Sequence, residues 1–320
     1  MQDKNSTRSV ATVTLQTATG LRATIADLGA TLARLEVPTA AGLVDTILHY
    51  ENPADIASDM FFLGSTAGPY ANRIRAARFR LDEDEFVLEA NEKGPGHCLH
   101  GGSTGLHRQY FDIDADEARA ECQVVLPDGL GGFPGNRSVR VIYQLLGDAA
   151  LAIDFEVTTD RDTVVSLANH AYFNLGGALS EHEIAIHADA YTPVHAGNIP
   201  TGEIRAVADS RFDLRNMGAV TEQQFDHNFA LGDPSNEPRL AAELRSPATG
   251  LQLNVHTTQP GIQLYTADYL AAPFAPRAGL CLEAQAFPDA PNQVGFPSAR
   301  LNAGETWRAR TVYEFVNTGH

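Results

Sequence analysis

Hydrophobic and polar residues alternate with a period of two along much of the chain. Residues 139–145 and 151–157 each place a large apolar side chain at every second position. Side chains of a β-strand point alternately to its two faces, so each segment predicts a strand with one buried face. Residues 146–150 form a short link that contains a glycine. The pattern therefore predicts a β-hairpin.

Other segments repeat this pattern. Residues 79–81 and 86–88 bracket an acidic turn over 82–85, and alternation returns in 251–255 and 307–313. Such short alternating segments, separated by turn residues, are typical of antiparallel sheets.

Signals for helices are few. Residues 53–58 and 240–244 each predict a helical turn or two, whereas 128–135 and 232–238 predict surface loops. Many short strands with few helices indicate an all-β protein, an antiparallel β-sandwich. No repeat, low-complexity tract or linker divides the 320 residues, so we expect a single domain over 1–320.

Composition and charge narrow the possible partners. The formal net charge is −17, which repels phosphate backbones and anionic lipids, so we expect neither nucleic-acid nor membrane binding. The chain has no long apolar stretch, and its polar first residues lack the apolar core expected of a signal peptide. Its three cysteines form neither a disulfide framework nor a CxxC metal pair. These features favour a cytoplasmic protein.

Motifs that bind nucleotide phosphates are missing from the sequence. There is no GxxxxGK[ST] loop and no GxGxxG between a strand and a helix. We therefore expect no nucleotide cofactor.

Two segments place polar groups where strands are expected. In 169–175, His170, Tyr172 and Asn174 share one face if the segment is a strand. In 280–287, Glu283 lies among apolar neighbours. Desolvation raises the pKa of a carboxyl group, and a histidine titrates near neutral pH, so this pair suits acid–base catalysis.

The residues alone also allow simpler interpretations. A strand glutamate such as Glu283 commonly faces solvent or pairs with an arginine. His170 taken by itself is no stronger evidence for a catalytic site than Glu283 is. His97, His100 and His107 suggest a metal site, but their spacing fits no standard zinc arrangement. We expect no metal.

Seven motifs, in order along most of the chain, resemble the aldose 1-epimerase family, whose members are also called galactose mutarotases. They are Ala71-Asn72-Arg73-Ile74; Leu99-His100-Gly101-Gly102; Pro127-Asp128-Gly129 with Gly132-Phe133-Pro134-Gly135; Asn169-His170 with Tyr172-Phe173-Asn174-Leu175; Phe225-Asp226-His227-Asn228-Phe229; Pro260-Gly261-Ile262-Gln263 with Tyr265-Thr266; and Glu283-Ala284-Gln285 with Pro288-Asp289-Ala290. Each motif is weak alone, and their order makes the resemblance specific.

The resemblance implies a large twisted antiparallel β-sandwich with an open sugar-binding cleft. It implies that Glu283 is the general base and His170 the general acid in the interconversion of the α and β anomers of a free aldose such as glucose or galactose, with no cofactor. The residues that it implies around the sugar are Asn72, Arg73, His100, Tyr172, Asp226 and Gln263. We expect a monosaccharide as the small-molecule partner, and a monomer or a homodimer.

Two departures from the family pattern bear on the substrate. Pro69 stands where an arginine is common in the family, and residues 103–110 lack the usual Phe-Asp-Lys and Trp. A hexose-6-phosphate 1-epimerase, with an anion site near Arg73, Arg75, Arg78 and Arg80, is one alternative. A non-catalytic sugar-binding protein is another. A glycosidase would need a second carboxylate, from Asp226 or Asp289.

Overall fold

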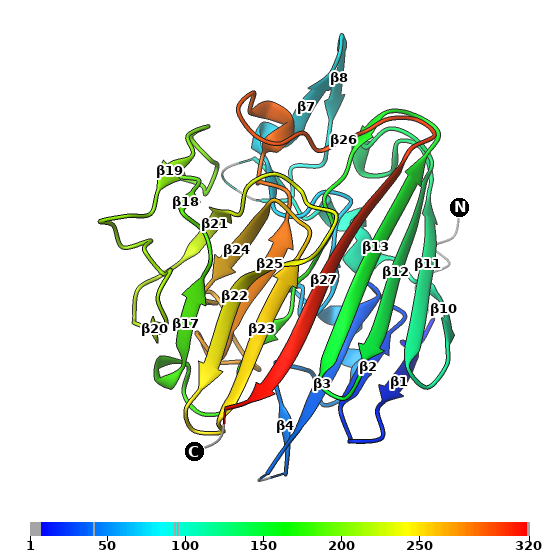
Figure 1. The fold of residues 1–320 in the computed structure, drawn as a ribbon. Helices are drawn as coiled ribbons and strands as arrows, with labels where there is room; N and C mark the ends of the chain where they lie inside the picture. The colour runs from blue at the N-terminus through cyan, green and yellow to red at the C-terminus, as the bar shows by residue number, and fades with distance from the viewer. Residues whose placement is uncertain (1–7, 41, 93, 95, 319–320) are drawn as a thin grey trace.

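The computed structural model describes residues 8–40, 42–92, 94 and 96–318. Strands dominate this part of the chain, and every pairing between its named strands is antiparallel (Figure 1). The predicted all-β, antiparallel fold class is confirmed.

One large sheet forms the front layer in Figure 1. Its nine strands, in spatial order, are β10 (Asp112–Ala115), β11 (Arg119–Leu126), β12 (Arg137–Leu146), β13 (Ala150–Thr159), β27 (Thr306–Asn317), β23 (Leu251–Thr257), β22 (Arg239–Ser246), β17 (Glu183–Ile186) and β20 (Gly218–Ala219). The predicted hairpin is β12–β13, in which Val139 faces Val157. The strands predicted over 251–255 and 307–313 are parts of β23 and β27.

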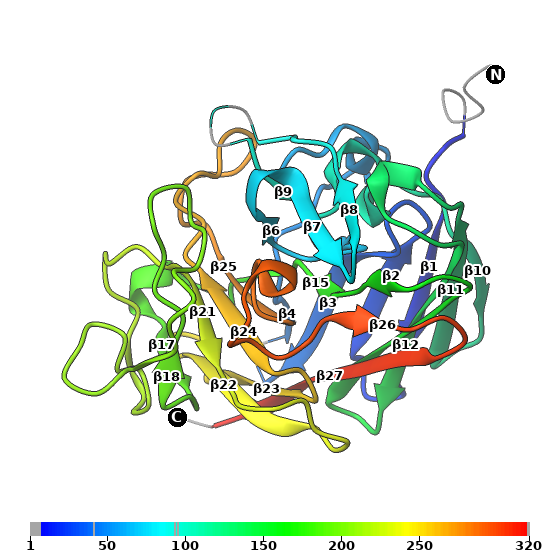
Figure 2. The same ribbon diagram turned by 90° about the horizontal axis from the view of Figure 1, so that it is seen from above.

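Two further sheets lie behind the large one, as the view from above shows (Figure 2). The first consists of β16 (Tyr172–Phe173), β25 (Leu280–Gln285), β24 (Gly261–Tyr265), β21 (Asp226–Ala230), β18 (Ala190–Tyr191) and β19 (Arg205–Ala206). The second consists of β1 (Thr12–Gln16), β2 (Arg22–Ala26), β3 (Thr31–Thr39) and β4 (Gly42–Asp45). The arrangement is a sandwich.

Four two-stranded ladders complete the named strands of the described chain. They pair β5 (Thr66–Ala67) with β15 (Ala168–Asn169), β6 (Arg73–Ile74) with β9 (Cys98–Leu99), β7 (Arg78–Leu81) with β8 (Asp84–Val87), and β14 (Thr163–Val164) with β26 (Arg300–Leu301). The β7–β8 hairpin extends away from the body of the molecule at the top of Figure 1.

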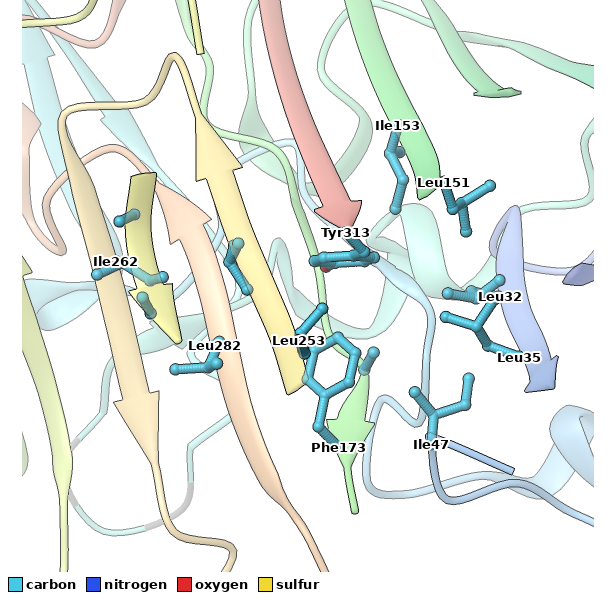
Figure 3. Packing of buried hydrophobic residues seen from close by; sticks show 14 of the residues in the cluster. Leu32, Leu35, Ile47, Leu151, Ile153, Phe173, Leu253, Ile262, Leu282 and Tyr313 are labelled. Atoms are coloured by element: carbon cyan, nitrogen blue, oxygen red, sulfur yellow. The ribbon is translucent and has the colours of Figure 1, made fainter. Parts of the chain in front are cut away.

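The main hydrophobic core fills the space between the layers (Figure 3). Tyr313 and Leu253 of the large sheet meet Phe173 and Leu282 of the six-stranded sheet, and Leu35 of the four-stranded sheet joins the same cluster. The Phe173 and Tyr313 rings pack edge to face with their centroids 5.0 Å apart. This burial explains the period of two, because each strand presents every second side chain to the core.

Helices are short in the described part of the chain. All are 3₁₀ turns, and none is long and apolar enough to cross a bilayer. They are η1 (Pro53–Ser58), η2 (Arg75–Ala77), η3 (Gly102–Thr104), η4 (Leu106–Arg108), η5 (Leu130–Gly132), η6 (Leu179–Glu181) and η7 (Ala290–Asn292). The helical turn predicted over 53–58 is confirmed as η1, where the Asn52 side chain accepts a hydrogen bond from the Ala54 N–H.

The helical turn predicted over 240–244 is wrong. These residues belong to β22, which pairs with both β17 and β23. The register shifts between Leu240 and Ala242, so consecutive alanines, Ala241 and Ala242, are both buried. The bulge breaks the period of two, and a run of good helix formers is therefore held as a strand by its two neighbours.

Three smaller predictions need adjustment. The acidic turn is shorter than 82–85, because β8 begins at Asp84. Residues 169–175 do not form one strand but divide between β15 and β16. The predicted loop over 128–135 contains η5, and its Phe133 is fully buried.

Candidate active site

A pocket of about 290 Å³ opens beside β25 and β16. Its lining residues are Met60, Phe61, Phe62, Asn72, Arg73, Leu99, His100, His170, Tyr172, Asp226, Tyr265, Tyr269 and Glu283. Every site residue predicted from the sequence is among them except Gln263. The fold therefore brings together groups that lie far apart along the chain.

Glu283 lies in the middle of β25, where all six residues are buried. Leu280 and Leu282 belong to the main core, and the opposite face of the strand carries Glu283 toward the pocket. In the register of the sheet, Glu283 faces Gln263 on β24, and Gln263 in turn faces Asn228 on β21. The Oε2 atom of Glu283 is buried and has no hydrogen-bond partner among the described residues, so it can accept a hydrogen bond from a ligand.

His170 occupies the turn between β15 and β16. Its backbone is fixed on both sides, because its N–H donates to the Ser65 carbonyl and its carbonyl accepts from the Gly64 N–H. Its Nε2 atom lies 3.7 Å from Oε2 of Glu283, and its Nδ1 atom lies 3.6 Å from the Cys281 sulfur. An imidazole and a carboxyl group thus face each other at the wall of the pocket.

Burial shifts the pKa values of these two groups in opposite directions. It raises the pKa of Glu283 to about 8, with a further rise from Asp226 and an opposing effect from Arg73. Burial also lowers the pKa of His170 to about 4. Between these values the pair holds a single proton, which burial favours on Glu283 because burial penalises the charged form of each group.

His100 and Asn72 adjoin the short β6–β9 ladder. Both residues adopt left-handed backbone conformations, with φ of 51° and 65°. Their backbones are joined by the His100 N–H donating to the Asn72 carbonyl over 3.0 Å, and the Asn72 N–H donates to Nδ1 of His100 over 3.1 Å. Gly101 follows, and a Cβ there would stand 2.3 Å from the Gly68 carbonyl oxygen. Two turns are thus locked against each other.

The bond to Nδ1 also fixes the proton of His100. Burial holds the pKa of His100 well below its usual range, so the ring is neutral. A neutral imidazole that accepts at Nδ1 carries its proton at Nε2. His100 is therefore a hydrogen-bond donor at Nε2.

A metal can be tested against this geometry. His100, His170 and Glu283 each offer a ligand atom within 4.8 Å of the other two. A metal at Nε2 of His100 would require the proton to move to Nδ1, where the Asn72 N–H already points. This cluster is not the histidine trio considered from the sequence, because it shares only His100 with that trio. His97 has a different role, since its Nδ1 atom accepts a hydrogen bond from the Ala76 N–H. The donor set fits proton transfer and hydrogen bonding better than metal binding.

Arg73 and Asp226 form a charged network at one side of the pocket. The Asp226 carboxylate accepts from Nε2 of Gln263 at 2.6 Å and from Nδ2 of Asn198 at 2.7 Å. Arg73 Nη1 lies 3.5 Å from the same carboxylate, and its other nitrogens contact Glu92. Gln263 therefore reaches the site through Asp226. Burial lowers the pKa of the Arg73 guanidinium, but Asp226 and Glu92 raise it by more, so the overall shift is upward and the group stays ionised.

The sequence profile described as aldose 1-epimerase matches residues 11–314. The chain belongs to the aldose 1-epimerase family. The recognition made from the seven motifs is confirmed, and with it the class of enzyme, because the family consists of isomerases that act on carbohydrates.

Relatives with assigned names cover almost the whole chain. Galactose mutarotase from Bos taurus is 36% identical over 315 residues, which are 92% of this chain and 91% of the relative. Aldose 1-epimerase from Escherichia coli K12 is 32% identical over 329 residues, with 95% and 94% covered.

Solved aldose epimerase structures share the fold. The GalM/aldose epimerase homologue from C. elegans superimposes with a TM-score of 0.91 at 27% identity, covering 97% of this chain and all of the other. Galactose 1-epimerase from Lactobacillus acidophilus gives 0.86 at 26% identity, with 99% and 97% covered. The predicted galactose mutarotase-like sandwich is confirmed.

Six lining residues of this aldose epimerase were not predicted as site residues. Leu99 and Tyr265 lie within the motifs quoted from the sequence, whereas Met60, Phe61, Phe62 and Tyr269 lie outside them. Phe62 packs against His100 with ring centroids 4.6 Å apart, and it has a left-handed φ of 57°. Residues 60–63 are apolar without alternation and follow the helical turn over 53–58 after one residue, Asp59. That departure from the period of two is the signal that was available.

Proposed function

We propose that the protein interconverts the α and β anomers of a free, uncharged aldose, with Glu283 as general base and His170 as general acid. The observation that carries the proposal is the buried pair itself. The two side chains face each other across 3.7 Å at the pocket wall, and Oε2 of Glu283 has no partner among the described residues. Acid–base exchange needs one group that accepts a proton while another donates one.

The reaction proceeds by ring opening. Glu283 takes the proton of the C1 hydroxyl, His170 donates a proton to the ring oxygen, and the C1–O5 bond breaks to give the aldehyde. Rotation about C1–C2 presents the other carbonyl face, and O5 then attacks it. On closure, His170 takes the proton from O5 and Glu283 returns one to the new C1 hydroxyl, so the roles reverse.

The sugar supplies what the pair needs to start. Without sugar, burial favours the proton on Glu283. A hydroxyl that donates to Oε2 stabilises the carboxylate, as does the nearby Arg73 charge, and the proton then belongs on His170. Binding thus favours the ionised pair that the reaction uses.

The other predicted residues suit a polyhydroxylated ring. His100 donates from Nε2, Asp226 accepts, and the Asn72 side chain has an amide group for donation after Oδ1 has accepted from the Arg73 N–H. Tyr172 donates its hydroxyl to the Phe61 carbonyl, so we assign its ring to the apolar wall.

Two alternatives have less support. For a phosphorylated sugar, Arg75 and Arg78 pair with Asp289 and Glu85, and neither lines the pocket. For a glycosidase, Asp289 is fully buried and accepts from the Arg75 N–H, so it is not available as a second acid. Asp226 does line the pocket, but its carboxylate accepts from Gln263 and Asn198 and faces Arg73, which suits a binding group better than a second catalytic acid.

Polarimetry of freshly dissolved α-D-glucose and α-D-galactose, with chelator present, tests the proposal, and glucose 6-phosphate is assayed alongside them. We expect the protein to accelerate the approach to equilibrium for at least one sugar. If it accelerates neither but the sugars raise its melting temperature, the protein binds sugar without catalysis. If it accelerates only glucose 6-phosphate, the substrate assignment is wrong.

A further inference from the structure

Arg73 is the permanent cation among the described residues that line the pocket, since the other arginines of the described chain are not lining residues. The two lysines of the sequence, Lys4 and Lys93, lie outside the described residues. The pocket also holds the carboxyl groups of Asp226 and Glu283. Among the described lining residues, Arg73 is therefore the permanent cation with which an anionic group on a sugar could pair.

The guanidinium of Arg73 is already occupied. Its Nε lies 3.1 and 3.0 Å from the two carboxylate oxygens of Glu92, and its Nη2 lies 2.9 Å from Oε1 of Glu92. Its Nη1 faces Asp226 at 3.5 Å. Glu92 itself is not a lining residue. The pair is bidentate, the geometry in which a carboxylate binds arginine most strongly.

We propose that Glu92 is a specificity-determining residue, which neutralises Arg73 from behind the pocket and so restricts the enzyme to uncharged aldoses. The inference rests on the proposed function and specifies its substrate class. A phosphate that approaches Arg73 must displace Glu92 or share the guanidinium with it. Either event brings like charges together, with Asp226 beside them.

The position of Glu92 makes this testable without touching the reacting groups. Its side chain is 19% exposed, and replacement by glutamine keeps its size and its ability to accept from Nε. Only the charge is removed. Asp226, at 3.5 Å from Nη1, is then the remaining carboxylate that contacts Arg73 among the described residues. We expect the guanidinium of this variant to be able to bind an anion in the pocket.

The experiment compares wild type with Glu92→Gln in mutarotation of glucose and glucose 6-phosphate, and in inhibition by inorganic sulfate. We expect the ratio of kcat/KM for glucose 6-phosphate to that for glucose to rise about tenfold or more, as the loss of a charged contact predicts. The inhibition constant for sulfate should fall by a similar factor.

Two control variants accompany it. Glu89→Gln makes the same charge change nearby, but Glu89 accepts from the N–H and hydroxyl of Ser103 rather than from Arg73. Glu92→Asp keeps the charge, and the ratio should stay near that of wild type.

The proposal is overturned if the ratio and the sulfate constant do not change in Glu92→Gln, or if they change equally in Glu89→Gln. Sulfate binding to both proteins is also measured by calorimetry. If wild type fails to accelerate glucose mutarotation, the proposed function fails, while tighter sulfate binding by Glu92→Gln would still support the charge argument.

Discussion

Glu283 carries a carboxyl group in a place that solvent hardly reaches. It is 2% exposed, on a strand whose six residues are all buried. A buried acid without a partner for one oxygen is unfavourable for folding alone. Such a group is expected where function requires it, and the opposite pKa shifts of Glu283 and His170 point to the same conclusion.

Replacing either member of the pair should remove catalysis. We expect Glu283→Gln and His170→Asn each to lower kcat by about 100-fold or more, the scale of a lost acid–base group, while sugar binding survives. Polarimetric rates and sugar-induced thermal shifts measure the two effects. Glu243→Gln on β22, whose carboxylate contacts His187 outside the pocket, is the matched control. A variant that altered only KM would instead mark its residue as a binding group.

The dependence of the rate on pH follows from the same pair. Above about pH 8, Glu283 loses its proton and His170 is neutral, so the pair has no proton to donate. Below about pH 4, both groups are protonated and neither can act as a base. We expect kcat/KM to form a plateau between these limits and to fall on both sides. A profile that stays flat through pH 9 would contradict paired proton transfer.

Single residues also mark how far the sequence could predict the site. Glu283 and His170 were identified because their motifs resemble a family, and strand alternation agreed with the desolvation of Glu283. The proton on Nε2 of His100 was not predictable, because it depends on a hydrogen bond from Asn72, 28 positions earlier. Phe62 was missed although residues 60–63 depart from the period of two, because that departure does not show that the left-handed backbone of Phe62 turns its ring toward His100.

Among the elements, alternation predicted the long strands and failed where the ladder is irregular. β12 and β13 have a continuous register over their whole length, so their period of two appears directly in the sequence. β22 contains a bulge, and its alanine-rich segment resembles a helix until its partners on both sides are known. The short ladders of two residues, such as β6–β9, are too brief to form any pattern.

The ladder β6–β9 makes a further prediction at this scale. Gly101 has φ of 84°, and a Cβ there would lie 2.3 Å from the Gly68 carbonyl oxygen. We expect Gly101→Ala to lower the free energy of unfolding in urea and to reduce activity through His100. Gly20→Ala is the control, because Gly20 has φ of 102° but nothing within 4 Å of a Cβ. Left-handed strain alone costs about 1–2 kcal/mol, so an equal loss in both variants would show that the contact with Gly68 is unimportant.

For the molecule as a whole, the three cysteines are buried and unpaired. Burial raises the pKa of Cys98 and of Cys122 to about 12, and that of Cys281 well above its usual range. Thiolates are the reactive form. We expect the native protein to react slowly with a thiol reagent, and all three cysteines to react once it is unfolded. Rapid reaction of one thiol in the native state would show that the structure around that cysteine opens readily to solvent.

The pocket takes its lining from positions between Met60 and Glu283, on strands of several ladders and on the turns between them. Contacts of such long sequence separation form late, after the chain has closed its large loops. The active site thus has no local folding unit of its own. Recovery of mutarotation during refolding should coincide with the last stage of assembly, and a proteolytic cut between the contributing strands should abolish activity unless the fragments remain associated.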